Sequence, residues 1–320
     1  MPRRGRNGTV VGANGYKVGL ALGGGAARGW SHIGVIEALL EAGIEPVAIA
    51  GTSMGALVGG AYAAGRLDAL RKWAEALDRK AMVSLLDISL TRGGVVDGQR
   101  IQNLLVELGI GQLIESFPVA FAAVATDLAD GSEIWLEKGP AAAAIRASIS
   151  MPGIFSPVLL EVRWLVDGGL INRVPVSTCR ALGADFVIAV SVSEGLLDRR
   201  REKLRAGLGG NEDAEREARV SQMLGQVPAG LRSPAEHILP YLVKGGPQSP
   251  GYFDVLVNSL NIMQERITRS RLAGEPPHVM IAPEVASINL LEFDRAKETI
   301  AAGRAAVERT IGAIRDMLSC

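Results

Sequence analysis

Residues 18–34 of the 320-residue chain have the sequence VGLALGGGAARGWSHIG, and this stretch decides the expected fold. The apolar and small residues 18–22 are typical of a buried strand. Glycines follow, and from about 29 to 42 apolar residues recur at helical spacing. Residues 47–55, VAIAGTSMG, repeat the order of strand, glycine-containing turn and helix start. These units predict an α/β protein with a mostly parallel sheet covered by helices on both faces.

The rest of the chain continues this alternation. Further strands are expected at 118–126, 133–136, 186–190 and 279–281, with a hairpin formed by 158–162 and 164–166. Further helices are expected at about 67–79, 97–108, 141–148, 175–182 and 253–272, and at the C-terminus. Asn289 and Glu292 could form the capping box of the last helix.

Composition divides the chain into four segments. We expect a disordered N-terminal arm at 1–15, a core of alternating strands and helices at 16–192, a variable and partly helical insertion at 193–250, and C-terminal helices with one strand at 251–320 that pack on the core. The insertion is distinguished by dense charges and repeated prolines.

Charge and cysteine content restrict the function. Lys plus Arg equals Asp plus Glu at 34 each, so the chain lacks the basic excess typical of nucleic-acid-binding proteins. The two cysteines, Cys179 and Cys320, are too few for a disulfide framework and lack metal-site spacing. The basic N-terminus has no apolar signal segment. We therefore expect a cytoplasmic protein without nucleic acid or metal.

An uncharged stretch at 46–65 has the length of a membrane span. It contains Thr52, Ser53 and five glycines, and its periodicity changes midway. A strand followed by a helix is therefore expected here instead of a transmembrane helix.

The first loop that suggests chemistry is the glycine-rich segment 23–29. Residues without bulky side chains let backbone N–H groups approach an anion, and a helix N-terminus adds partial positive charge. Such a loop suits a phosphate or the oxyanion of an acyl-transfer intermediate. A tight turn with close helix–strand packing would explain it equally well.

The second loop, 51–55, has the pattern G-x-S-x-G, which places a serine on a sharp strand-to-helix turn. Gly51 and Gly55 leave room for the turn, and the Met54 N–H can point at a substrate oxygen. In a glycine-rich chain the pattern alone is weak. Its position between a strand and a helix favours Ser53 as a nucleophile.

The third loop is Asp167-Gly168-Gly169, after the apolar strand ending at Val166. Each of the three loops follows the carboxyl end of a strand, where ligands bind in open α/β sheets. A serine hydroxyl needs a neighbouring base, and Asp167 can serve if burial raises its pKa toward neutrality. The alternative is a turn or cap residue.

These residues resemble the patatin-like phospholipases, in particular the bacterial RssA-type branch related to neuropathy target esterase. The resemblance is carried by 22–34, 51–55 and 167–169, supported by IRASISMPG at 145–153 and RALGAD at 180–185. It covers about 17–192, and the separate segment 264–277 also resembles that branch.

The resemblance implies a three-layer α/β/α fold and a Ser–Asp catalytic dyad without histidine. Ser53 would attack an ester carbonyl and Asp167 would be the base. The oxyanion hole would be formed by the N–H groups of Gly24, Gly25 and Ala26. Arg28 would buttress the loop, with Met54, Gly51, Gly55, Gly168 and Gly169 in supporting positions. Many relatives have glycine where Ala26 stands.

The implied activity is that of a serine hydrolase, a lipid acyl hydrolase or carboxylesterase of lysophospholipase type. The implied partner is a lipid or acyl-ester substrate, which allows peripheral contact with a membrane. No cofactor is implied, and the oligomeric state is not indicated.

Two alternatives stay open at this point. One is a Ser-His-Asp hydrolase or acyltransferase that uses His32 or His237, although His32 is better explained by packing. The other is a non-catalytic lipid-binding pseudo-enzyme. A nucleotide-binding module is disfavoured, because Arg28 and Gly29 stand where a P-loop requires lysine. For Arg146, an ion pair, a lipid-headgroup contact and a solvated side chain are all compatible with the sequence.

Overall fold

The computed structural model describes residues 15–78, 81–82, 96–193 and 252–319. The arm at 1–14, most of an apolar run at 82–90, the insertion from 194, His237 and Cys320 lie outside these ranges. The chain forms two compact units, one of Met1–Glu194 with Arg266–Cys320 and one of Gly195–Glu265. The boundary falls within helix α11 (Tyr252–Gly274) rather than at the predicted residue 250.

The first unit is built on one sheet with the strand order β5-β6-β3-β2-β1-β7-β8, and β4 pairs with β3. The strands are β1 (Val18–Leu22), β2 (Ala48–Thr52), β3 (Ala120–Asp127), β4 (Glu133–Leu136), β5 (Val158–Leu160), β6 (Arg163–Asp167), β7 (Phe186–Val190) and β8 (Val279–Ile281). The five strands β3, β2, β1, β7 and β8 run parallel. Strands β4 and β6 run antiparallel to β3, and β5 pairs antiparallel with β6 as the expected hairpin. The predicted mostly parallel sheet is confirmed.

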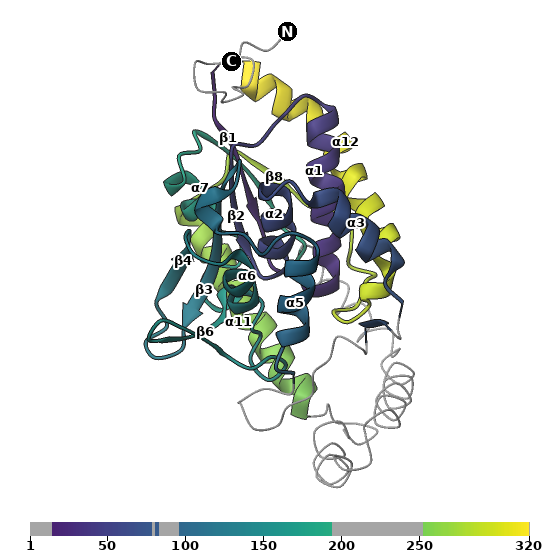
Figure 1. Ribbon diagram of the computed structural model, residues 1–320. Helices are drawn as coiled ribbons and strands as arrows, with labels where there is room; N and C mark the ends of the chain where they lie inside the picture. Colours follow the sequence, from purple (N-terminus) through teal and green to yellow (C-terminus); the bar gives the residue numbers. More distant parts are fainter. Residues whose placement is uncertain (1–14, 79–80, 83–95, 194–251, 320) are drawn as a thin grey trace, which may run out of the picture. The chain divides into compact units, whose positions relative to one another are not determined.

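Helices cover both faces of this sheet (Figure 1). One face shares its core with α1 (Ser31–Glu41), α2 (Met54–Ala63), α3 (Leu67–Ala76), α5 (Gln99–Glu107), α6 (Ala141–Ser148) and α12 (Ala296–Ser319). The other face packs against α7 (Val176–Ala181) and Leu272 of α11. The predicted three-layer α/β/α fold is confirmed.

The residue size on each face of the strands explains how closely the helices approach. Along β1, Leu20 and Leu22 point into the larger core, whereas Ala21 points toward α7, because alternate strand residues face opposite sides. A Cβ at Gly19 would lie 2.5 Å from the Cys179 Sγ atom, so glycine is needed there for α7 to pack.

The uncharged stretch at 46–65 forms β2 and α2, as predicted. Within the described ranges, none of the helices combines the length and apolarity that a membrane crossing requires. Asn289 and Glu292 form the predicted contact, but this contact does not cap the start of the last helix. Asn289 N–H does donate to the Glu292 carboxylate (2.9 Å), but the 3₁₀ helix η4 (Phe293–Arg295) follows, and α12 begins only at Ala296.

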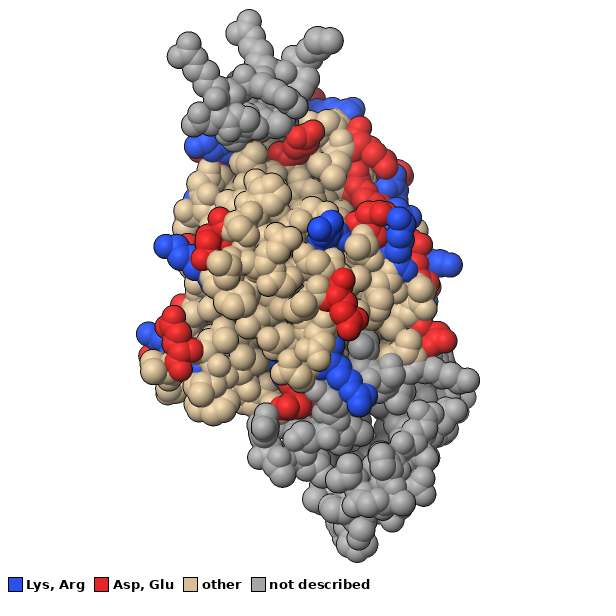
Figure 2. Space-filling view, viewed as in Figure 1, with Lys and Arg blue, Asp and Glu red and all other residues tan. Residues whose placement is uncertain are grey.

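Helices α1 and α12 pack with their backbones in contact. A Cβ at Gly34 would lie 2.0 Å from the Ile300 carbonyl oxygen, and one at Gly303 would lie 2.0 Å from the Ser31 carbonyl oxygen. Ion pairs cover the outer edge of this contact, where Glu37 binds both Arg71 of α3 and Arg304 of α12. In Figure 2, charges of both signs alternate toward α3 and α12, while much of the remaining visible surface is uncharged.

Candidate active site

Ser53 lies on a strained turn between β2 and α2. Its backbone has φ 55° and ψ −121°, in a region that L-residues rarely adopt. The conformation is supported by Ser148, whose hydroxyl accepts the Ser53 N–H (2.9 Å) and donates to the Val124 carbonyl (2.6 Å). A Cβ at Gly55 would lie 2.0 Å from the Leu22 carbonyl oxygen, so the tight turn requires this glycine.

The Ser53 hydroxyl donates a hydrogen bond to Asp167 Oδ2 at 2.7 Å. The other carboxylate oxygen, Oδ1, accepts the Gly169 N–H at 2.7 Å. Asp167 is only 2% exposed, and burial raises the pKa of its carboxyl to about 6 against the opposing effects of Ser53, Gly169 and Arg173. The carboxylate is therefore in contact with the hydroxyl and has a pKa suited to proton exchange near neutral pH.

Asp167 reaches Ser53 by a different route from the one expected. It ends β6, which runs antiparallel to β3, and it pairs with Ala125, while Thr52 at the end of β2 pairs with Val124. Strand β3 extends beyond β2, so β6 returns along it and ends beside Ser53. The glycine and serine loops meet because both follow the carboxyl ends of parallel strands, as expected. Asp167 does not fit this explanation, because its strand runs antiparallel to β3.

The glycine loop lies directly against the nucleophile, since a Cβ at Gly24 would be 3.3 Å from the Ser53 Cβ. The Gly24 N–H donates to the Arg173 carbonyl at 3.0 Å, so its expected role as an oxyanion donor needs correction. The N–H groups of Gly25 and Ala26 have no acceptor within the part of the chain that the structure describes. Ala26 has φ 48°, which explains why glycine is the easier residue at this position.

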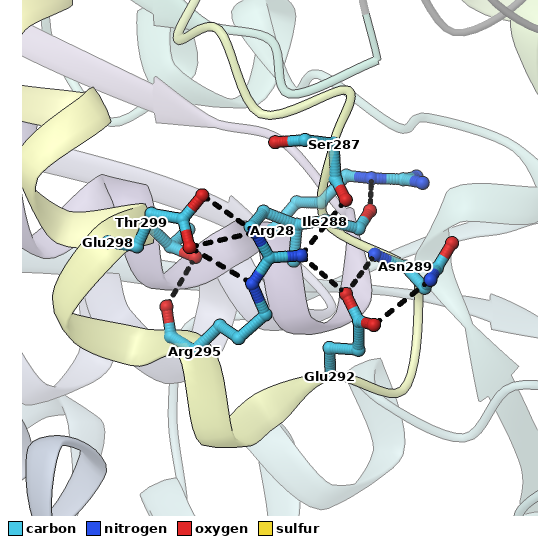
Figure 3. Close-up of polar contacts among 8 residues, drawn as sticks. All are labelled: Arg28, Ser287, Ile288, Asn289, Glu292, Arg295, Glu298 and Thr299. Carbon is cyan, nitrogen blue, oxygen red and sulfur yellow. Dashed lines mark hydrogen bonds and ion pairs between the residues drawn. The ribbon is translucent and has the colours of Figure 1, made fainter.

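Arg28, which follows the glycines of this loop, is bound to the segment around Ile288. The sequence did not indicate this contact. Its Nε donates to the Ile288 carbonyl at 2.7 Å (Figure 3). Burial is the main reason why its pKa falls to about 10; Arg173 lowers the pKa further and Glu292 raises it. Figure 3 also shows Arg295 bound to Glu292, which fixes the segment containing Ile288.

His32 also contacts the glycine loop and not the serine. Its Nε2 lies 2.7 Å from the Gly23 carbonyl oxygen, so this nitrogen carries the proton. Complete burial lowers the pKa of His32 to about 4, and within the described ranges its Nδ1 has no hydrogen-bond partner. The histidine is neutral at physiological pH and positions a carbonyl group.

The sequence missed the roles of Ser148, Arg173 and Arg146, because their partners are distant in the chain. Arg146 is 2% exposed and donates to the Ser150 hydroxyl and to the carbonyls of Ser156 and Asp97. Of the three alternatives that the sequence left open for Arg146, the solvated side chain is wrong. In the described part of the chain, no group of three His, Cys, Asp or Glu side chains could hold a metal ion.

The comparison with known protein families gives a match that covers the three loops described above. The family model of the patatin-like phospholipases matches residues 20–180, and the chain belongs to this family. Membership supports lipid hydrolase activity.

Three relatives illustrate the match. The uncharacterized NTE family protein Rv1063c of Mycobacterium tuberculosis is 35% identical over 340 residues, which cover 95% of this chain and 94% of the relative. The uncharacterized NTE family protein Rv2565 of the same organism is 30% identical over 95% of this chain and 48% of its own length. The lysophospholipase nte1 of Emericella nidulans is 35% identical over 56% of this chain and 12% of its own length.

Proposed function

We propose that the chain is a serine-dependent lipid acyl hydrolase with Ser53 as nucleophile and Asp167 as its side-chain base. The observation that carries the proposal is the 2.7 Å hydrogen bond from the Ser53 hydroxyl to the buried Asp167 carboxylate. Serine becomes an effective nucleophile when an adjacent base accepts its proton. No histidine in the described ranges contacts Ser53 in this way.

In the proposed first step, the Ser53 Oγ bonds to the ester carbonyl carbon as its proton moves to Asp167 Oδ2. The carbonyl oxygen becomes an oxyanion and accepts hydrogen bonds from the N–H groups of Gly25 and Ala26, with Met54 as a further donor. Such pre-positioned donors stabilise the charge that develops in the transition state. The intermediate then expels the alcohol, which takes the proton from Asp167.

Water completes the proposed cycle. Asp167 accepts a proton from the water molecule as its oxygen attacks the acyl-enzyme carbonyl carbon. The Ser53 Oγ leaves with that proton, which releases the fatty acid and restores the dyad. With a pKa of about 6, Asp167 is mostly ionised at neutral pH and remains basic enough for both steps.

The proposed substrates are single-chain acyl esters, with lysophospholipids first among them. Family membership and the name of the fungal relative support this choice. We also propose a cytoplasmic protein that contacts the membrane peripherally to reach its lipid. The buried free thiol of Cys179 is compatible with a reducing compartment.

The test compares hydrolysis of lysophosphatidylcholine and of p-nitrophenyl esters of graded length. Wild type should hydrolyse both, and Ser53→Ala should lose about 10⁴-fold or more of kcat. Ser116→Ala, at an exposed serine that bonds only its own turn, is the matched control and should keep full activity. Activity that survives in Ser53→Ala, or a wild type that hydrolyses no ester, would refute the proposal.

A further inference from the structure

Arg173 forms two hydrogen bonds with the Gly24 backbone, one as acceptor and one as donor. Its carbonyl accepts the Gly24 N–H at 3.0 Å, and its guanidinium Nε donates to the Gly24 carbonyl at 3.1 Å. Arg173 is 5% exposed. Both polar groups of the Gly24 backbone are therefore fixed by one residue, immediately before the amides of Gly25 and Ala26.

The short segment 167–173 contacts every part of the site. It begins with Asp167, the partner of the Ser53 hydroxyl. The Asn172 carbonyl then accepts the Thr52 hydroxyl at 2.7 Å, which holds the residue before the nucleophile. Arg173 follows and binds the glycine loop. The segment thus fixes the base, the serine loop and the glycine loop relative to one another.

Arg173 also contributes charge to the site. Its cation acts on Asp167, where it lowers the carboxyl pKa and opposes the larger effect of burial. The other groups acting on Asp167 are the neutral donors Ser53 and Gly169. Arg28 is a like-charged neighbour of Arg173, and Glu292 compensates Arg28.

We propose that Arg173 is a positioning residue that fixes the glycine loop over Ser53 and holds a positive charge beside Asp167. This inference rests on the proposed function. The two roles are separable, because the bond to Gly24 needs the geometry of a guanidinium whereas the electrostatic effect needs only a cation.

The experiment measures kcat and KM from pH 4.5 to 9 for wild type, Arg173→Gln and Arg173→Lys. Arg173→Gln should lower kcat about 10²-fold, since a displacement of about 1 Å in an active site has this effect. Its acid limb should move up by about one pH unit because the cation is lost. Arg173→Lys should lower kcat while its acid limb stays at the wild-type position.

Arg180→Gln is the matched control. Arg180 is an exposed arginine of α7 that bonds the Pro276 carbonyl, and its replacement should change neither quantity. Melting curves identify any variant that fails to fold. If Arg173→Gln does not fold, Arg173→Lys decides alone: wild-type kcat, or a shifted acid limb, overturns the inference.

A folded Arg173→Gln with wild-type kcat and an unshifted acid limb would also overturn it. NMR titration of the Asp carboxyl carbons gives the pKa of Asp167 without catalysis, so the charge effect is measured even in an inactive protein. A wild type without esterase activity refutes the proposed function. An unshifted Asp167 pKa in Arg173→Gln refutes the effect of Arg173.

Discussion

At the scale of single residues, the site depends on a carboxyl group kept in an unfavourable environment. Asp167 is buried, and a serine hydroxyl, one backbone amide and a neighbouring arginine favour its charge. Because burial dominates, its pKa rises from 3.8 to about 6. The same shift that makes a better base reduces the stability of the folded protein at neutral pH.

Asp167→Asn should therefore separate activity from stability. The amide cannot accept a proton, so we expect kcat to fall by about 10³-fold or more and the acid limb near pH 6 to disappear. A raised folded-state pKa contributes stability that is complete below about pH 4 and is lost as pH rises through 6. The amide at position 167 of the variant does not titrate, so the stability of the variant does not change with pH through this group.

Relative to wild type, Asp167→Asn should gain on the order of 3 kcal/mol in unfolding free energy between pH 4 and pH 8, the equivalent of a shift of about two pKa units. Urea unfolding at both pH values measures the difference. An equal stability difference at pH 4 and pH 8 would mean that the carboxyl pKa is not raised.

His32 tests whether a histidine takes part in catalysis. Because its Nε2 is bound to the Gly23 carbonyl, His32→Ala should lower kcat by about 10²-fold or less through the loop, with the acid limb unchanged. A triad base would cost about 10⁴-fold. His237→Ala serves as the companion variant and should keep wild-type activity. A loss of about 10⁴-fold in either would favour a triad.

At the scale of elements, strand and helix ends supply the groups that hold the turn at Ser53. Sequence patterns predicted β1, β2 and the helices after them because apolar periodicity is local. They could not predict Ser148 or Arg173, whose partners Ser53 and Gly24 lie 95 and 149 residues away. They also did not show that β6 runs antiparallel to β3, because apolar periodicity does not tell which strands of a sheet are neighbours.

Ser148→Ala should destabilise the turn, because it leaves the buried Ser53 N–H without an acceptor. Such a group costs about 1–3 kcal/mol, and kcat should fall as the serine moves. Ser156→Ala is the control, since the buried Ser156 hydroxyl has no hydrogen-bond partner in the described ranges. Urea unfolding and ester hydrolysis of both variants provide the comparison, and equal effects would argue against a role for Ser148.

The contact between α1 and α12 should tolerate no side chain at Gly303. A Cβ there would meet the Ser31 carbonyl oxygen at 2.0 Å, so Gly303→Ala should lower stability by about 1–3 kcal/mol. Gly312→Ala, in the same helix with no atom within 4 Å of its Cβ, should instead raise it by up to about 1 kcal/mol. Thermal melting measures both, and a gain in stability at both positions would mean that helix propensity alone decides the effect and that Gly303 makes no close contact.

At the scale of the whole molecule, the C-terminal part completes the site. The segment around Ile288 binds Arg28, and α12 follows it through η4 and packs along α1. Buried residues of α12 belong to the same hydrophobic core as residues of β1 and β2. The sequence predicted a helix at the C-terminus, but it did not identify α1 as its partner, because an apolar helix face can pack against any part of a core.

The formal net charge of the chain is zero, and the visible face in Figure 2 carries charges of both signs. On this account the chemistry of the molecule depends on one serine and one aspartate. Labelling with a fluorophosphonate, followed by peptide mapping and by rates from pH 5 to 8, tests that claim most directly. We predict a single label on Ser53, half-maximal near pH 6 and absent in Ser53→Ala. A label on another residue, or one that persists in Ser53→Ala, would contradict the account.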